Sequence, residues 1–536
     1  MSIMKISDFN LEKILKIMRA NKSKTCKKMI QFIIFLFSYP VMELCEELDD
    51  NFKAKKGRPA YPRVLLLGVV IFCIFKRCDT FKEIENMLDD SRYLLIFTRG
   101  KIPKIGTIKS FLQDTTPLFF RKIFLLVLME FNENNLLKFL KIFIDGTDAI
   151  IRASRFNKIT RKQFEAFLTL YKHNLLEKEN SKTSIDIFKR KLEEYMIVYK
   201  NDHEVLDALK IAFKFPIFYN ETFISRIDEF KEKFNERNSK VLSVTFPESV
   251  LMRTKRGRFD FAFNLQLVMT EKNILLSSPL LSLPNDHGVL EYVLKDLYLN
   301  FEILIELIKK YGERKNYKEL LNMVKKAKKI MDSGYYDLKN LKTLIKYDEN
   351  GVINDKKTSR YKNTKLKDEE KIKKGITIPQ KEKFSKNHMK PVSNGLICSE
   401  NQLIEFKEII PIKTKINLSK EENEREYYKI FSGEKVCKNC KSKNNCLKDG
   451  EEYKIIKEIS NPIYDWMLKK NKHWGNKNIS KERMQAGESC NGFFKGIYEI
   501  HLPGSTQETV QNFMHLKGAV YNKIRLKNLK QEYSLP

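Results

Sequence analysis

The sequence lacks an apolar run long enough to cross a bilayer. Its most apolar stretches, at about 29–37 and 64–75, are shorter than the roughly 18–20 residues that a transmembrane helix needs. The N-terminal stretch MSIMKISDFNLEKILKIMRANK also lacks the apolar core and small-residue cleavage site of a secretory signal. We therefore expect a cytoplasmic protein with no membrane partner.

Cysteine and histidine are scarce. The nine cysteines are odd in number, and in a cytoplasmic chain they indicate reduced thiols or a metal site in preference to disulfides. The seven histidines are scattered, and His287, in PNDHG, has a loop context without a visible partner. We find no internal repeat, and no histidine is a candidate site residue.

Acidic residues are the minority among the charges. The 536 residues include 100 Lys and Arg against 68 Asp and Glu, a formal net charge of +32, and the pI is about 9.5. Such a field concentrates polyanions, which favours a nucleic-acid partner. The alternative is a solvated lysine-rich surface, because Lys far outnumbers Arg and Asn and Ile are abundant, as an AT-rich coding genome would produce.

The order of patterns along the chain predicts an α/β protein with a mixed sheet and flanking helices. With 42% hydrophobic residues the chain can bury several cores. A strand ending at Asp145, a hairpin at 259–283, helices, and a second short strand ending at Asp332 make up the sheet. We predict four parts: a helical N-terminal domain (1–135), a core (136–355) with a helical insertion at about 160–240, a basic connector and cysteine-bearing insertion (356–460), and C-terminal helices (461–536).

Three acidic residues stand out by their context. Asp145 and Asp332 each end a predicted strand before a glycine-containing turn, and Glu488 lies in the helical segment ERMQAGESCNGFFKG. Carboxylates at neighbouring strand ends, joined by a third from a packing helix, can hold two Mg²⁺ ions for phosphodiester chemistry. Taken singly, each residue fits an ordinary turn or helix surface equally well.

Four cysteines form a candidate zinc site. The segment KVCKNCKSKNNCLK holds Cys437, Cys440 and Cys446, and the fourth tetrahedral ligand that Zn²⁺ needs would be Cys398. The alternative is a set of reduced structural thiols, because Cys398 is distant in the sequence and unpaired. The remaining five cysteines are expected to pack as small apolar residues.

Two basic stretches are candidate phosphate contacts. The segment MRTKRGRFDF places Arg253, Lys255, Arg256 and Arg258 just before a strand, where they could neutralise phosphates near the active site or simply be solvated. The lysine-rich connector at 355–390 has the composition of a mobile loop or of a phosphate-facing surface.

Taken together, these segments resemble the DDE-type transposases of bacterial insertion sequences, in the long subgroup with a cysteine-bearing insertion before the catalytic Glu. GRPAYPRVLLLGVVIF and GKIPKIGTIKSF resemble the N-terminal domain of that family. FIDGTDAIIRASRFNK resembles the first Asp motif of the family, and the stretch from VTFPES to LEYVL resembles the middle of its core. KKIMDSGYYDLKNLKTL resembles its second Asp motif, and RMQAGESCNGFFKG resembles its Glu motif.

The resemblance implies an RNase H-like core, with Asp145, Asp332 and Glu488 as a catalytic triad that binds Mg²⁺ or Mn²⁺. It also implies that Arg483 and Lys495 contact DNA; Lys495 follows Glu488 by seven residues, two helical turns, so the two share a face. The implied partners are the terminal inverted repeats and target DNA, both double-stranded, in a homodimer or higher oligomer that is nucleoid-associated when bound.

Two departures from the family pattern keep an alternative open. Ser480 stands where the family often has Tyr, and Gly487 precedes the Glu where an apolar residue is usual, which lowers helix propensity by about 1 kcal/mol. The alternatives are a catalytically inactive relative that still binds DNA, and a zinc-containing DNA-binding protein without chemistry.

Overall fold

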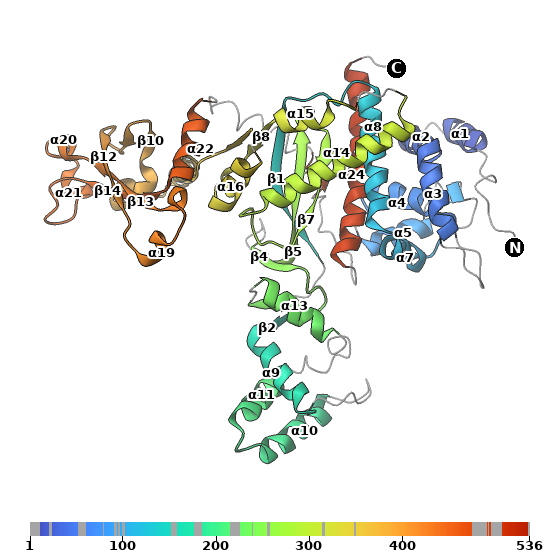
Figure 1. Ribbon diagram of the computed structural model, residues 1–536, viewed down its shortest axis with the longest axis horizontal. Coiled ribbons are helices and arrows are strands. Elements are labelled where there is room, and N and C mark those ends of the chain that lie inside the picture. The colour runs from blue at the N-terminus through green and yellow to red at the C-terminus, as the bar shows by residue number, and fades with distance from the viewer. Residues whose placement is uncertain are drawn as a thin grey trace.

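The computed structural model describes residues 11–20, 24–51, 61–78, 80–90, 94, 97–98, 102–151, 158–175, 185–214, 226–237, 240–253, 258–313, 317–347, 350–473, 490, 492–494 and 506–533. A mixed sheet lies in the middle of the molecule (Figure 1). The N-terminal helices lie on one side of it, a lobe with a second sheet lies on the other, and a helical arm projects away from both.

The central sheet, as far as the chain is described, has seven strands and is antiparallel on one side and parallel on the other. β5 pairs antiparallel with β1, β4, β6 and β7, whereas β1, β8 and β9 run parallel, in the order β4-β5-β1-β8-β9. Its strands are β1 (Lys141–Ile150), β4 (Val250–Arg253), β5 (Phe259–Thr270), β6 (Leu275–Ser277), β7 (Leu280–Leu281), β8 (Lys328–Met331) and β9 (Gly351–Ile353). The predicted α/β class, a mixed sheet with flanking helices and a helical N-terminal region, is confirmed.

Helices connect and cover the central sheet. Between β7 and β9 the chain forms α14 (Leu290–Tyr311), α15 (Leu320–Lys326), the 3₁₀ turn η3 (Ser333–Tyr335) and α16 (Leu338–Lys346). The buried stripe of α14, which includes Val293, Leu297 and Leu304, recurs at the spacing of three to four residues that places side chains on one helix face. That stripe joins the main hydrophobic core.

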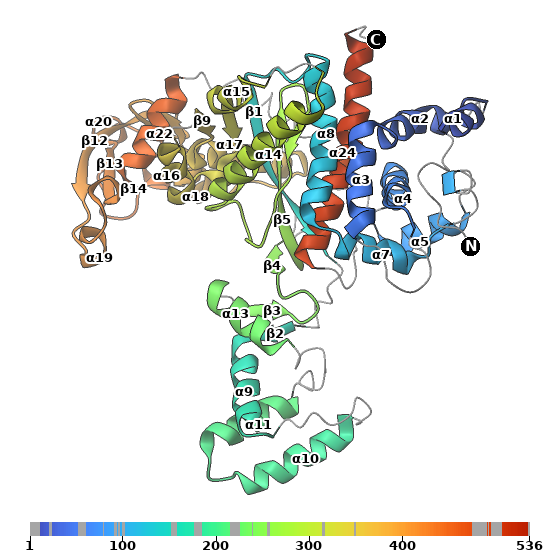
Figure 2. The ribbon, with the colours of Figure 1, turned by 45° about the vertical axis from the view of Figure 1, so that its right-hand side comes forward.

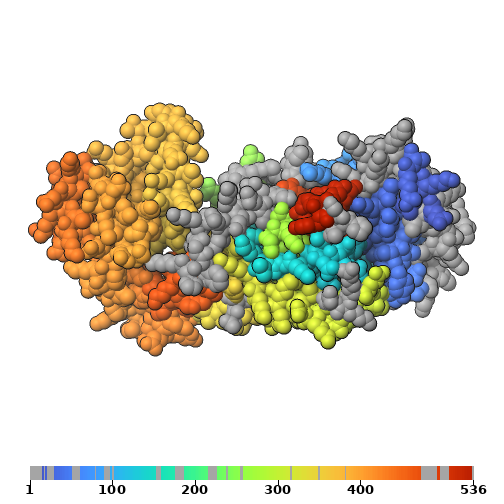
Figure 3. Space-filling model, turned by 90° about the horizontal axis from the view of Figure 1, so that it is seen from above, coloured from blue at the N-terminus to red at the C-terminus, as the bar shows by residue number. Residues whose placement is uncertain are grey.

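The N-terminal helices share this core with the sheet. They are α1 (Leu11–Ala20), α2 (Lys24–Leu36), α3 (Tyr39–Asn51), α4 (Arg63–Phe75), α5 (Phe81–Asp90), α7 (Ile105–Asp114) and α8 (Pro117–Glu133). The C-terminal helix α24 (Gln507–Glu532) packs against α4, α7, α8 and β6. Figure 3 shows it, in red, lying between the two ends of the molecule. These elements contribute buried side chains to one continuous cluster, except α1, whose partly buried Leu15 packs against it.

The helical arm, residues 158–243, projects from the central sheet (Figure 2). It has a hydrophobic core of its own. It contains β2 (Lys158–Thr160), α9 (Arg161–Lys172), α10 (Ile185–Val198), α11 (His203–Lys214), α13 (Ile227–Arg237) and β3 (Val241–Ser243). β2 and β3 pair antiparallel at its base, so the arm leaves and rejoins the central sheet at one point. Thr160 and Gln163 form a capping box that starts α9.

The distal lobe contains, within the described residues, a five-stranded antiparallel sheet that we call the distal sheet. Its strands are β10 (Lys390–Val392), β11 (Gly395–Ile397), β12 (Leu403–Pro411), β13 (Tyr427–Ser432) and β14 (Ile455–Ser460). The helices and turns around it are α17 (Lys356–Lys373), α18 (Gln380–Lys383), η4 (Lys386–His388), α19 (Lys415–Leu418), η5 (Glu422–Glu424), α20 (Glu434–Cys437), α21 (Lys443–Cys446) and α22 (Pro462–His473).

Two local expectations need correction. Of the two alternatives for the connector, the mobile loop is wrong over 356–373, because these residues form the helix α17, which begins where Asp355 accepts a hydrogen bond from the Thr358 amide at 2.8 Å. The strand with Asp145 does not end there, because β1 stays paired with the long strand β5 as far as Ile150.

Among the described residues no single helix is both long and apolar enough to cross a membrane. The bent pair Met29–Leu36 and Tyr39–Asp50, with an angle of 59° between its halves, meets the criteria of length and composition.

Candidate active site

Asp145 and Asp332 each follow directly on the last pair of two adjacent parallel strands, Ile144 of β1 and Met331 of β8. β1 and β8 pair at a constant offset of 187 positions, beginning with Lys141 opposite Lys328 (328 − 141 = 187). The same offset relates Asp145 to Asp332 (332 − 145 = 187), the residue directly after β8. Because paired strands lie about 4.8 Å apart, the two residues are neighbours in space.

The two carboxylates project from the same face of the sheet. Alternate residues of a strand share a face, so Asp145 lies on the side of Phe143, and Asp332 on the side of Ile330. Phe143 and Ile330 pack together with Val352 in a small hydrophobic cluster. Both carboxylates are therefore on the face of the sheet that carries this cluster.

Asp332 also organises the turn that follows it. Its Oδ1 accepts a hydrogen bond from the Gly334 amide at 2.7 Å and caps η3. Asp145, in contrast, lies inside β1 and not at its end. At Asp145 the parallel partner strand β8 has ended, whereas the antiparallel partner strand β5 continues. Asp145 is therefore paired on one side of β1 only.

A third carboxylate, which the sequence did not indicate, lies near Asp332 and against Gly146. Asp286 lies in the loop after β7, and a Cβ built on Gly146 would be 2.2 Å from its Oδ1. A Cβ on Gly334 would be 3.1 Å from its Oδ2 and 2.9 Å from Oδ1 of Asp332. The two glycines that follow the predicted catalytic aspartates thus make room for Asp286.

Buried amides hold Asp286 in place. Oδ1 of Asp286 accepts hydrogen bonds from Gln266 Nε2 at 2.8 Å and from Asn264 Nδ2 at 3.2 Å. Both amides are on β5 and are buried, and the buried Tyr335 hydroxyl donates to the Gln266 side chain. Polar side chains in the middle of a buried strand need such partners, so this network fixes the loop against the sheet.

The third predicted catalytic residue, Glu488, lies outside the described residues, as do Arg483, Lys495, Lys255 and Arg256. The nearest described residue to Glu488 in the sequence is Cys490, which is fully buried. Burial raises the pKa of the Cys490 thiol, and the negative charge of Asp145 raises it further. Cys490 therefore lies within electrostatic reach of Asp145.

Arg253 lies far from the carboxylates. It is the last residue of β4 and pairs with Phe259, whereas Asp145 pairs with Leu267 on the same strand β5. The eight residues between these partners (267 − 259 = 8) span about 26 Å at the usual rise of a strand. Arg253 is exposed there, near the base of the helical arm.

The four candidate zinc ligands come together in the distal lobe. Cys398 follows β11, and Cys437, Cys440 and Cys446 lie on or between the short helices α20 and α21; all four line one small cavity. Burial raises the pKa of the Cys446 thiol, and the three other cysteines raise it further. The tertiary structure thus gathers a thiol set of the type that Zn²⁺ prefers.

Neither site has the geometry of a closed metal site. Among the described residues, no group of three or more His, Cys, Asp or Glu side chains is arranged to hold a metal ion. The donor atoms differ between the two sites. Asp145 and Asp332 offer oxygen ligands, which suit Mg²⁺, whereas the cysteines of the distal cavity offer sulfur ligands, which suit Zn²⁺.

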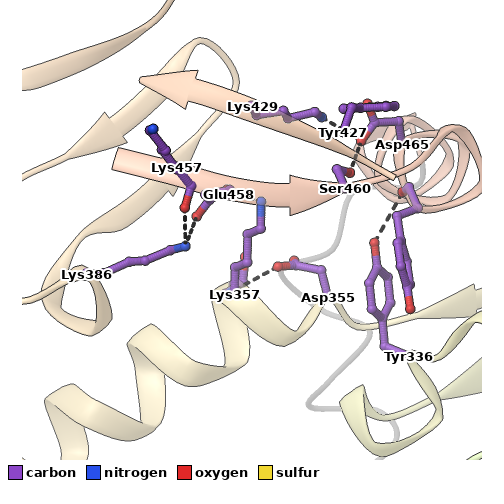
Figure 4. Close-up of polar contacts among 12 residues, drawn as sticks. Tyr336, Asp355, Lys357, Lys386, Tyr427, Lys429, Lys457, Glu458, Ser460 and Asp465 are labelled. Atoms are coloured by element: carbon purple, nitrogen blue, oxygen red, sulfur yellow. Dashed lines mark hydrogen bonds and ion pairs between the residues drawn. The ribbon is translucent and has the colours of Figure 1, made fainter. Parts of the chain in front are cut away.

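A cleft of about 670 Å³ separates α17 and α22 from the distal sheet. Its charged groups are largely paired with one another (Figure 4). The buried carboxylate of Glu458 accepts from Lys357 and lies 3.5 Å from Lys386, while Asp465 accepts from Lys429 at 2.5 Å. These pairs join α17 and α22 to the distal sheet and leave little net charge in the cleft.

Residues 29–114 match the family model described as "Transposase domain (DUF772)". The match covers most of α2 and ends at the last residue of α7, so it lies entirely within the N-terminal helices. It supports a transposase family for this chain. No curated protein and no solved structure was found to match.

Proposed function

We propose that this chain is a metal-dependent DNA transposase that cleaves the ends of an insertion sequence and joins them to target DNA. Two independent observations support the proposal: the neighbouring positions of Asp145 and Asp332, and the transposase-domain match at 29–114. The first carries the chemistry, because two carboxylates from adjacent strands are suited to a phosphodiester-cleaving metal site.

Asp145, Asp332 and Glu488 would hold Mg²⁺ or Mn²⁺. When bound, the ions would activate a water or a 3′-hydroxyl and stabilise the leaving oxygen. Asp332 keeps one oxygen on the Gly334 amide, which orients its carboxylate, and Asp286 is held beside Gly146 and Gly334 by the buried amides of β5.

The partner would be double-stranded DNA, both as inverted repeats and as target. Arg483 and Lys495, which flank Glu488 in the sequence, and the basic stretch Arg253, Lys255 and Arg256 would contact phosphates. A homodimer or a higher oligomer is expected because two element ends must be processed in one assembly. The protein would act in the cytoplasm on the nucleoid.

The test is cleavage by the purified full-length protein. A duplex that carries the DNA flanking the gene is incubated with Mg²⁺ or Mn²⁺, and nicked products are separated on a denaturing gel. Asp145→Asn, Asp332→Asn and Glu488→Gln should each abolish cleavage while the affinity for the duplex is retained. Asp207→Asn, an exposed carboxylate on the helical arm, is the matched control and should cleave as the wild type does.

The outcomes separate the alternatives. Unchanged cleavage in all three variants would show that the triad is wrong. A wild-type protein that binds the duplex but never cleaves it would indicate an inactive relative or a zinc-containing DNA-binding protein.

A further inference from the structure

Helix α17 is unusual because it has no buried side. The structure describes all 18 of its residues, and none is buried. A helix that buries no apolar stripe gains little from packing, so its composition is not explained by the core. Its first twelve residues, 356–367, contain six Lys or Arg and no acidic residue.

Polar contacts attach one side of α17 to the rest of the distal lobe. Lys357 donates to the buried carboxylate of Glu458, and Asp368 accepts from His388 at 2.8 Å. Lys357, Asp368 and the half-buried Tyr361 lie on the same side of the helix. The helix is therefore held in a fixed orientation by polar contacts.

A second face of α17 carries cations without acidic partners. At 100° per residue, Arg360 and Lys367 lie about 40° and 20° from Lys356, so the three share one face. In the part of the chain that the structure describes, none of the three forms an ion pair with a carboxylate, and Arg360 and Lys367 are exposed. At a rise of 1.5 Å per residue they are spaced by about 6 and 10.5 Å along the helix.

This face begins at the candidate active site. Asp355, which caps α17, follows β9, the parallel neighbour of β8, so the helix starts at the sheet edge that carries Asp332. Nζ of Lys356 lies 3.4 Å from Nε2 of His287, the residue after Asp286. The row of cations thus starts beside the carboxylates and runs away from them along α17.

We propose that the Lys356–Arg360–Lys367 face of α17 is a docking surface for the phosphate backbone of duplex DNA. It would hold the duplex whose cleaved or attacked bond lies at Asp145 and Asp332. This inference rests on the proposed function for the identity of the duplex. Phosphate contacts of this kind position a duplex without reading its sequence.

The test compares two variants that each remove three positive charges. Lys356→Gln/Arg360→Gln/Lys367→Gln removes the α17 face. Lys318→Gln/Lys325→Gln/Lys326→Gln is the matched control, since these lysines are on or next to α15, which precedes β8 and so lies at the opposite edge of the sheet. Affinity for a fluorescent random-sequence duplex of about 40 base pairs is measured by anisotropy over a range of salt concentrations.

The α17 variant should lower the slope of log affinity against log salt by about 2.7, since each lost phosphate contact accounts for about 0.9. The control should keep the wild-type slope, and the charge-conserving Lys356→Arg/Arg360→Lys/Lys367→Arg variant should restore it. The inference would be overturned if the slope of the α17 variant differed from the wild-type slope by less than about one unit. It would also be overturned if the wild-type protein did not bind the duplex.

The failure of this inference differs from that of the proposed function. If Asp145→Asn abolishes cleavage but the α17 variant keeps its slope, the docking surface alone is wrong. If the slope falls as expected but the wild-type protein never cleaves, the transposase chemistry is wrong and the docking surface stands.

Discussion

Gly146 lies directly against the carboxylate of Asp286. A Cβ at position 146 would stand 2.2 Å from Oδ1 of Asp286 and 2.8 Å from Nε2 of Gln266, so no other residue fits without displacing one of them. The sequence indicated a turn glycine here. Its role is instead to let a loop 140 residues further along the chain (286 − 146 = 140) approach the strand that carries Asp145.

Gly146→Ala should destabilise the protein by about 1–3 kcal/mol, because the added methyl group pushes into a packed, hydrogen-bonded site. Gly106→Ala is the matched control. A Cβ there meets nothing within 4 Å, and Gly106 lies in α7, where alanine is favoured by up to about 1 kcal/mol. Urea unfolding of both variants should therefore give shifts of opposite sign; equal shifts would contradict the close approach to Asp286.

Asp286→Asn should raise the Mg²⁺ concentration for half-maximal cleavage by about 10–100-fold, as changes to groups that support metal ligands do. The new amide oxygen can still accept from Gln266 and Asn264, so the loop should keep its place while one negative charge is lost. A magnesium titration of cleavage measures this. Asp207→Asn serves as the control, and an unchanged magnesium dependence in Asp286→Asn would exclude a role for the charge.

His515 should make the protein sensitive to mild acid. Burial lowers its pKa to about 3, and the charge of Arg121 contributes, whereas the unfolded chain titrates near 6.5. Because the folded pKa is depressed, the unfolded state binds more protons below pH 6.5, and stability falls as the pH drops from 6.5 towards 3. At pH 5 this loss amounts to about 2 kcal/mol.

His515→Gln should remove that loss. The difference between the free energies of unfolding at pH 7 and pH 5, from urea denaturation, should be smaller by about 2 kcal/mol in the variant than in the wild type. The comparison of differences cancels any constant effect of the substitution and the titration of other groups. An identical difference in both proteins would show that His515 does not titrate as its burial implies.

The four cysteines of the distal cavity should bind about one zinc ion per chain. Elemental analysis of the purified protein should detect it, and Cys440→Ser and Cys446→Ser should lose it, since each removes one of four thiolates. Cys45→Ser, at a buried cysteine outside this set, should retain zinc even if it lowers stability. A wild-type protein free of zinc, with a melting temperature insensitive to chelator, would leave the thiols as structural residues.

Much of the central sheet was predictable because its signals are local. The β5 hairpin, the helix after it and the short strand before Asp332 each follow from periodicity and turn residues within a few positions. The end of β1 was not predictable, since Gly146 looks the same in a turn and in a strand. Only the partner strand β5, over a hundred residues later, keeps that segment extended.

The sequence by itself determined the residue types and their order: a basic chain, two aspartates at short predicted strands, and an insertion with three cysteines close together and Cys398 apart from them. The tertiary structure alone decided which of them meet. Asp286 carries no distinguishing local pattern, and the sequence left open whether Cys398 joins the other cysteines and whether the connector is a loop or a basic surface. The neighbours of these residues are set by strand register and by the folding of distant loops, and these depend on packing across the whole core.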